Sequence, residues 1–291
     1  MIEAVQTSGL RRAARPGPVQ VIAVTGGKGG VGKTSVAVNL ATAFACAGRR
    51  VMLLDGDLGL ANVDVFLGLS PRHTMAHVLS GERTLEEIII ESPQGVQIVP
   101  GASGVAELAN LSAAGHLNLV RAFSALSSQI DTLIVDTSAG ISHSVVQFTQ
   151  AAQHALVVVC DEPASMTDAY ALAKVMSRNH GMRTFRILAN MVRTPGEGEL
   201  LFRKLERVTS RFLDVTLDYV GEIPDDPYLR RSIREQRPVV TAFPASPSSR
   251  AFKKLALRAD KWPVPDAPRG NLEFFVERLI RTPQPRLEVV Q

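Results

Sequence analysis

The feature that most constrains this chain is a glycine-rich segment after its first apolar run, Gly26-Gly27-Lys28-Gly29-Gly30-Val31-Gly32-Lys33-Thr34. Residues 27–34 satisfy the phosphate-loop pattern, in which glycines let backbone N–H groups turn toward phosphate oxygens. Val19 to Thr25 before the loop predicts a buried strand, and Lys33 to Ala47 after it predicts a helix. This context favours a nucleotide phosphate site over a glycine turn that binds nothing.

Three side chains of the loop carry specific expectations. Lys33 is placed to reach the terminal phosphates, and the Thr34 hydroxyl is placed to bind Mg²⁺ directly. The general pattern does not require Lys28, but a second ammonium makes sense if it reaches the nucleotide of a neighbouring subunit, as an arginine finger does. The alternative is a solvated loop lysine. The loop residues expected to contact ATP are Gly27, Lys28, Gly29, Gly30, Val31, Gly32, Lys33, Thr34 and Ser35.

Short apolar runs alternate with helical segments along most of the chain. The further runs are Val51 to Leu54, Val96 to Val99, Thr132 to Val135, Ala155 to Val159, Phe185 to Ala189 and Tyr219 to Ile223. Strands that are apolar throughout are buried on both faces, so the pattern predicts an α/β fold with a doubly wound, mostly parallel sheet and helices on both faces. Ligands of such sheets bind outside the carboxyl ends of the strands.

Composition indicates the class of protein and its organisation. The 291 residues are 45% hydrophobic and 21% charged, which favours one continuous core and excludes a disordered or disulfide-stapled chain. A net charge of +4 permits a nucleic-acid surface without indicating one. With two cysteines and no apolar signal segment, we expect a cytoplasmic protein.

We expect a flexible lead (1–18), a phosphate-loop domain (19–262) and a tail (263–291) with an amphipathic helix at 271–281.

Carboxylates follow two of the predicted strands. Asp55 and Asp57 come where the run from Val51 leaves the core, and a carboxylate there can orient or deprotonate an attacking water. We expect Asp55 to support Mg²⁺ through water, with a turn or helix cap as the alternative. Asp136 ends the run from Thr132 and is predicted to hold Mg²⁺ through its water shell. The backbone N–H of Gly140 is then predicted to sense the terminal phosphate.

The loop with its extra Lys28 resembles the signature of the MinD/ParA family of deviant Walker A ATPases. The resemblance runs from about Val19 to the Pro224 region. Family members bind ATP and Mg²⁺, sandwich two nucleotides between two subunits and hydrolyse ATP slowly, so that the ATP-bound dimer is a signal. The resemblance implies the same for this chain, with Lys28 acting across the homodimer and Asp57, at the first switch position, activating water. The implied catalytic set is Lys28, Lys33, Asp57 and Asp136.

Five more positions match the family pattern outside the loop. The resemblance implies that Asn62 lies near the nucleotide and that Asn190 reads the adenine edge with its amide. It also implies that Pro224 and Asp225 flank the adenine with a loop. Glu162 resembles a residue that contacts the nucleotide of the partner subunit, with an exposed, solvated glutamate as the alternative.

Relatives on this scaffold have contrasting functions. Electron-transfer and cluster-scaffold members use suitably placed cysteines, whereas Cys46 and Cys160 are better explained here as small core residues. A DNA-segregation ATPase needs a basic surface for duplex binding. The arginine cluster that can supply it is Arg230, Arg231, Arg234 and Arg237, for which a solvated face is the expected role. We therefore do not expect direct nucleic-acid binding.

Several longer strings resemble the FleN/FlhG branch of MinD-like regulators of flagellar number. They are Leu53 to Asp64, Val159 to Pro163, Asp168 to Leu172, Leu188 to Met191 and Pro268 to Leu279. The branch implies an ATP-dependent dimer that binds the flagellar activator FleQ and restrains its activity, in opposition to the GTPase FlhF. Some members activate that GTPase through an amino-terminal DQAxxLR segment. This chain keeps Gln6, Leu10 and Arg11 of that segment but departs from it at Val5 and Thr7.

The last predicted helix has two possible roles. Its apolar face consists of Leu272, Phe275, Val276, Leu279 and Ile280. MinD relatives attach to membranes through such a helix, which would place this protein at the inner membrane or the cell pole. Glu273 and Glu277 interrupt the basic face that membrane binding normally needs, so packing on the protein's own core is favoured over regulated membrane contact.

Overall fold

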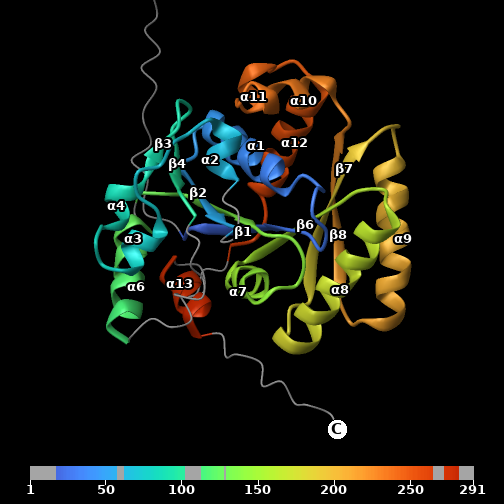
Figure 1. The fold of residues 1–291 in the computed structure, drawn as a ribbon. Coiled ribbons are helices and arrows are strands. Elements are labelled where there is room, and N and C mark those ends of the chain that lie inside the picture. Colours follow the sequence, from blue (N-terminus) through green and yellow to red (C-terminus); the bar gives the residue numbers. More distant parts are fainter. Residues whose placement is uncertain (1–17, 58–61, 102–112, 128, 265–271, 282–291) are drawn as a thin grey trace, which may run out of the picture.

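The structure is a computed structural model that describes residues 18–57, 62–101, 113–127, 129–264 and 272–281. Almost all of the expected flexible lead and most of the expected tail lie outside these residues. The described strands form one sheet in the order β3-β4-β2-β5-β1-β6-β7-β8 (Figure 1). Their bounds are β1 Gln20–Thr25, β2 Val51–Gly56, β3 Ile90–Glu91, β4 Val96–Val99, β5 Thr132–Thr137, β6 His154–Val159, β7 Thr184–Val192 and β8 Thr216–Pro224.

The sheet is parallel apart from the pairing of β3 with β4. Every residue of β1, β2, β5 and β6 is buried, because helices cover both faces of these strands. Strand β1 lies at the centre, with Val24 beside Asp136 of β5 on one edge and Ile22 beside His154 of β6 on the other. The doubly wound α/β fold that the sequence predicts is confirmed.

Two layers of helices enclose the sheet (Figure 1). The layer on one face comprises α1 (Lys33–Cys46), α2 (Val63–Leu67), α10 (Pro227–Arg234), α11 (Val239–Ala242) and α12 (Pro247–Ala259). The layer on the other face comprises α3 (Met75–Leu79), α4 (Leu85–Ile88), α6 (Ala113–Ser127), α7 (His143–Ala151), α8 (Pro163–His180), α9 (Glu197–Phe212) and α13 (Leu272–Arg281). None of the described helices combines the length and apolarity needed to span a membrane.

The structure differs from the sequence prediction in a few elements. The antiparallel strand β3 and the short helices α2, α3, α4, α10 and α11 were not expected, because segments this short carry little periodicity. Cys160 is buried as expected, but the expectation for Cys46 is wrong. Cys46 is the last residue of α1 and is exposed, because the helix reaches solvent there.

Helix α13 packs on the protein's own core. The Phe275, Val276 and Leu279 side chains are buried against α6 and α7, and the ring of Phe275 stacks on Phe148 with 6.5 Å between centroids. Gln147 Nε2 also donates a hydrogen bond of 3.3 Å to the carbonyl of Leu279. The core packing that the sequence favours is therefore the arrangement in this structure.

A buried aromatic and cationic cluster closes the opposite, amino-terminal edge of the sheet. His154 lies edge-on to Trp262 at 5.3 Å, and the guanidinium of Arg186 lies over the Trp262 ring at 4.4 Å. Burial, reinforced by the nearby Arg186 charge, lowers the pKa of His154 to about 3. The imidazole is therefore neutral in the folded protein across the physiological range of pH.

The pKa of His154 predicts a loss of stability in mild acid. In the unfolded chain the pKa of His154 returns to about 6.5. Below that pH the unfolded chain therefore binds a proton at His154 that the folded chain does not bind, which favours unfolding. We expect the parent to lose about 2 kcal/mol more unfolding free energy than His154→Gln between pH 7 and pH 5. Urea unfolding at both pH values measures this difference, and equal losses in the two proteins would contradict the assignment.

Candidate functional site

The phosphate loop lies at the middle of the carboxyl edge of the sheet. It joins β1 to α1, and the strands on either side of β1 are β5 and β6. The chain therefore runs toward opposite ends of the sheet on the two sides of β1. Asp136, the last carboxylate of β5, and Asp55 of β2 are neighbours in register at the same edge. The topology therefore brings together side chains that are far apart in the sequence.

Glycine is required at two positions where the loop touches other elements. A Cβ on Gly27 would lie 2.3 Å from the carbonyl of Asp168 in α8, and a Cβ on Gly32 would lie 2.4 Å from Asn190 Nδ2. Gly32 also has φ 90°, the left-handed conformation that glycine tolerates best, and no side chain caps α1 there. A Cβ on Gly29 would meet no atom within 4 Å. The loop is thus fixed at its ends, with open space at Gly29 and an uncapped helix N-terminus behind it.

Lys33 is almost fully buried beneath the loop. Its side-chain Nζ donates a hydrogen bond of 3.2 Å to the carbonyl of Lys28. Burial lowers the pKa of Lys33, while the carboxylates of Asp136 and Asp57 act in the opposite direction. This buried ammonium has one acceptor among the described residues, which suits an anionic ligand because phosphate oxygens would satisfy its remaining protons.

Lys28 pairs with Glu162 of the same chain. Its Nζ donates to Glu162 Oε2, and this hydrogen bond raises the pKa of Lys28, which keeps the ammonium charged. Glu162 stands at the N-cap of α8, the helix on which Gly27 rests. Both side chains are partly exposed. The sequence predicts that both residues act across a dimer, and the structure brings them together within one subunit.

Asp55 organises the segment after β2. Its Oδ1 accepts from the N–H of Asp57 at 3.0 Å, and its Oδ2 accepts from the N–H groups of Asn62 and Val63 at 3.0 and 3.1 Å. Burial nevertheless raises the pKa of Asp55 to about 6. The carboxylate thus anchors the start of α2, so the capping alternative is observed, and its role in water-mediated metal binding stays a prediction.

Asp57 and Asn62, both held by Asp55, also contact each other. Asn62 Nδ2 approaches Asp57 Oδ2 at 3.4 Å, and Asp57 is half-buried. A side chain at Gly56, between the two aspartates, would clash, because its Cβ would lie 2.9 Å from the carbonyl of Asp136 and 3.2 Å from the Phe148 ring. Asp57 therefore projects from a tightly packed point of the sheet edge, close enough to Lys33 to influence its pKa.

Asp136 is the strongest sign of a cation at this site. It is fully buried, and neither carboxylate oxygen accepts a hydrogen bond of normal geometry from the described residues. Burial raises its pKa to about 8, and the neighbouring Thr34 hydroxyl offsets that rise in part. Because an unpaired buried carboxylate is costly, a divalent cation beside Asp136 and Thr34 fits these residues.

The second loop at this edge is bonded to the first. The N–H of Gly140, which has φ 92°, donates to the carbonyl of Gly26 at 3.2 Å. The predicted phosphate-sensing N–H therefore points toward the phosphate loop, and its present acceptor is a protein carbonyl.

Asn190 connects the loop to the predicted base site. Its Nδ2 donates to the carbonyl of Val31 at 2.7 Å, while its buried Oδ1 has no donor among the described residues. The sequence predicts that the amide offers the base both a donor and an acceptor, and one of its two N–H groups is already bonded to Val31. The acceptor left over fits the exocyclic amine of adenine. The hydroxyl of Ser35, also expected at the nucleotide, is buried and has no hydrogen-bond partner among the described residues.

Pro224 is the last residue of β8, where it pairs with Val192 of β7, and Asp225 follows it. The N–H of Asp225 donates to the carbonyl of Val192 at 2.8 Å, which ties the predicted adenine loop to β7. The Asp225 carboxylate pairs with Arg230. In the same arginine cluster Arg231 pairs with Glu235 at 2.7 Å. The cluster is thus partly neutralised, in keeping with the solvated face that the sequence favours.

Sequence reasoning missed two residues at the site. Asp168 supports Gly27 through its backbone, and Met191 has φ 59°, which is unusual for a residue with a side chain. Met191 is 45% exposed, in the irregular pairing of β7 with β8. Neither could be found from residue type, because backbone position and not side-chain chemistry brings them to the site.

Comparison with known proteins is consistent with this geometry. A family model of the ParA group, described as NUBPL iron-transfer P-loop NTPase, matches residues 18–259. The chain belongs to the ParA family of P-loop NTPases. Antiactivator FleN of Pseudomonas aeruginosa is 59% identical over 266 residues, which cover 91% of this chain and 95% of that protein.

More distant relatives share the fold. Flagellum site-determining protein YlxH of Helicobacter pylori is 34% identical, with 91% of each chain covered. The septum site-determining protein MinD of Pyrococcus horikoshii, solved with Mg-ADP, is 28% identical. Its TM-score is 0.67, and the match covers 84% of this chain and 96% of that one. The MinD/ParA resemblance that the sequence predicts is confirmed.

The unpaired Oδ1 of Asn190 predicts selectivity for adenine. We expect the parent to bind ADP at least about tenfold more tightly than IDP, which lacks the exocyclic amine, because IDP leaves this acceptor unsatisfied. Asn190→Ala should weaken both nucleotides, since it also removes the bond to Val31, but should bring their dissociation constants close together. Titration calorimetry of the two nucleotides gives the ratio, and an unchanged ratio in the variant would contradict the assignment.

Proposed function

We propose that this protein is an ATP-dependent, dimerising regulatory ATPase that controls flagellar number by binding FleQ and restraining its activity. The observation that carries the proposal is the 59% identity to Antiactivator FleN over 91% of the chain. Described residues of two of the matching strings lie at the site: Asp55, Asp57 and Asn62 of the first, and Asn190 of the second. A regulator of this branch needs an intact nucleotide site. The buried ionisable groups at the sheet edge support the presence of such a site.

The proposed roles follow from the positions of the side chains. Lys33 and the uncapped N-terminus of α1 bind the phosphates, and Thr34 with Asp136 holds Mg²⁺, which would neutralise phosphate charge when bound. Asp57 orients the water, and Asp55 keeps Asp57 and Asn62 in place through backbone hydrogen bonds. Asn190 accepts from the adenine, with Pro224 and Asp225 closing the loop beside it.

Dimerisation is proposed to release the contact between Lys28 and Glu162. In one chain the ammonium is held by Glu162, so Lys28 has to leave this carboxylate before it can reach a phosphate of the partner subunit. Both side chains are partly exposed, and exchanging an exposed ion pair for a phosphate contact costs little. Glu162 is then free to approach the partner's nucleotide, as the resemblance implies.

The oligomeric state tests the switch. We expect the protein to be a monomer without nucleotide and a dimer with ATP and Mg²⁺, measured by light scattering after size exclusion. Lys28→Ala should weaken the ATP-bound dimer at least about tenfold, because a charge-assisted contact to phosphate is lost. Lys261→Ala is the matched control, since Lys261 is an exposed lysine just after α12. A parent that stays monomeric in ATP and Mg²⁺ would overturn the dimer.

The partner is tested separately with purified FleQ. We expect immobilised FleQ to retain the protein in ATP and Mg²⁺ and to retain much less of it in ADP. Retention that does not depend on nucleotide, or no retention of a protein that dimerises normally, would remove FleQ from the proposal and leave the ATP switch intact.

A further inference from the structure

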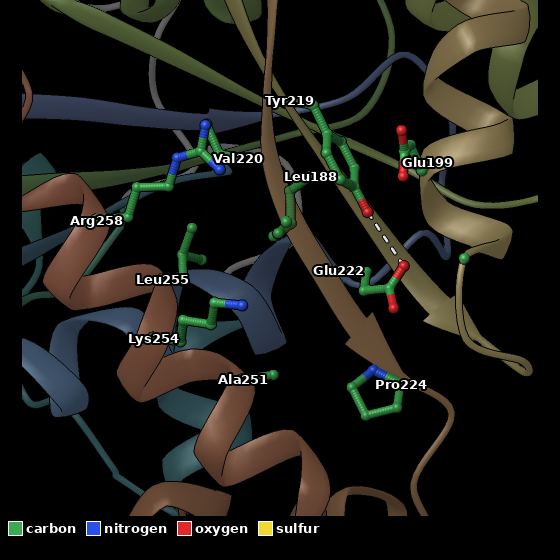
Figure 2. A pocket seen from close by; sticks show the side chains of 12 residues that line it. Leu188, Glu199, Tyr219, Val220, Glu222, Pro224, Ala251, Lys254, Leu255 and Arg258 are labelled. Atoms are coloured by element: carbon green, nitrogen blue, oxygen red, sulfur yellow. Dashed lines mark hydrogen bonds between the residues drawn. The ribbon is translucent and has the colours of Figure 1, made fainter.

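A cavity lies along the edge strand β8, three strands away from β1, which leads into the phosphate loop. It has a volume of about 470 Å³ and is bounded by the edge strand β8, by α12 and by the first turn of α9 (Figure 2). Its apolar lining includes Leu188, Val220 and Leu255, which are buried core residues. A pocket of this size with an apolar floor suits a small molecule.

Glycines keep this cavity open. Gly196 and Gly221 line it, and a Cβ on either would meet no atom within 4 Å. A Cβ on Gly198, in contrast, would lie 2.4 Å from Glu222 Oε2 and 2.7 Å from the Tyr219 hydroxyl. The absence of a side chain at 198 therefore lets the Tyr219 and Glu222 side chains take up their positions in the wall.

One wall of the cavity is cationic. Lys254 and Arg258 lie one turn apart on α12, and both line the cavity. Arg258 Nη2 donates to Asp218 at 3.2 Å, whereas Lys254 has no ion pair or side-chain hydrogen bond to any described residue. In Figure 2 the Lys254 side chain extends from the helix toward the space in front of Glu222. The ammonium is thus available to an anion.

The opposite wall is acidic. The hydroxyl of Tyr219 donates to Glu222 Oε2 at 3.1 Å, and burial with the Glu222 charge raises the pKa of Tyr219, so the phenol stays protonated. Glu222 Oε1 accepts no hydrogen bond from the described residues. Glu199 adds a second carboxylate, although Arg203 pairs with it at 2.6 Å. This wall can therefore accept hydrogen bonds from a cationic group.

From this arrangement we infer that the cavity binds a small zwitterion with a short apolar body. Its carboxylate or phosphate lies against Lys254 and Arg258, its ammonium against Glu222 and Glu199, and its body against the apolar floor. A simple anion would face two carboxylates and a simple cation would face two cationic side chains, and each would be penalised by like-charge repulsion. A molecule with separated opposite charges matches both walls.

The position of the cavity gives its occupant a route to the nucleotide. Pro224 lines the cavity and directly precedes Asp225, which is tied to Val192 in β7. Leu188, on the cavity floor, is two residues before Asn190 on the same strand. Occupancy therefore shifts the affinity for ATP. This second step rests on the proposed function, whereas binding of the zwitterion does not.

The binding test uses nucleotide-free protein, so its outcome is independent of the proposed function. The probes are the free L-amino acids and phosphoethanolamine, screened by saturation-transfer NMR and titrated by calorimetry, which separates carboxylate from phosphate ligands. We expect at least one probe to bind, and its N-acetylated form to bind at least about tenfold more weakly because Glu222 loses its cationic partner. No binding by any probe, or equal binding of the acetylated form, overturns the inference.

Three variants locate the site. We expect Lys254→Met and Glu222→Gln each to weaken the bound probe at least about tenfold, and Ala251→Met to abolish binding by filling the cavity without changing its charge. Lys261→Met, outside the cavity, is the matched control. Unfolding midpoints within the range of the control establish that the variants are folded. Undiminished binding in all three variants overturns the assignment to this cavity.

The same probe then tests the coupling. With the bound probe at saturation, we expect the dissociation constant of ATP to change at least about fivefold, the lower end of the usual range for coupling between two sites. If the protein binds the probe but does not bind ATP, the proposed function is contradicted and the zwitterion site is supported. Protein that binds both independently would refute only the coupling.

Discussion

The structure depends on two opposite charges that are buried at one edge of the sheet without an ion pair between them. Lys33 donates to a backbone carbonyl, and Asp136 has no hydrogen-bond partner of normal geometry among the described residues. Burial lowers the pKa of the first and raises that of the second to about 8. In the absence of a ligand burial disfavours the charged form of each group, so Asp136 is mostly protonated near neutral pH. A phosphate with its cation would stabilise both charged forms. The fold thus holds a binding site at the expense of its own stability.

The remaining contacts of the site control where those charges lie. Gly27 and Gly32 let the loop approach α8 and Asn190 closely, and a side chain at either position would collide with them. Asp55 fixes the segment that carries Asp57 through three backbone hydrogen bonds. The N–H of Gly140 bonds to the carbonyl of Gly26. Asp57, Asn62 and Gly140 are therefore attached to the sheet edge or to the phosphate loop by backbone hydrogen bonds.

Much of the fold and of the loop could be predicted from the sequence, because local patterns determine them. The buried strands are continuous apolar runs, and the strand–loop–helix order around Lys33 and Thr34 identifies the phosphate site. The exposed position of Cys46 could not be predicted, since it depends on where α1 leaves the core. The pairing of Lys28 with Glu162 and the prior use of the Asn190 amide by Val31 are contacts between distant segments, which no local pattern encodes.

The central claim is that two subunits share a nucleotide, with Lys28 acting on the site of its partner. ATP turnover by an equimolar mixture of Lys28→Ala and Asp57→Ala subunits tests it most directly. If Lys28 acts in trans, each mixed dimer contains one site with both groups intact, and random pairing should restore about a quarter of the parental rate. If the mixture is no faster than the average of the two variants measured separately, Lys28 does not act across the dimer and the account is wrong.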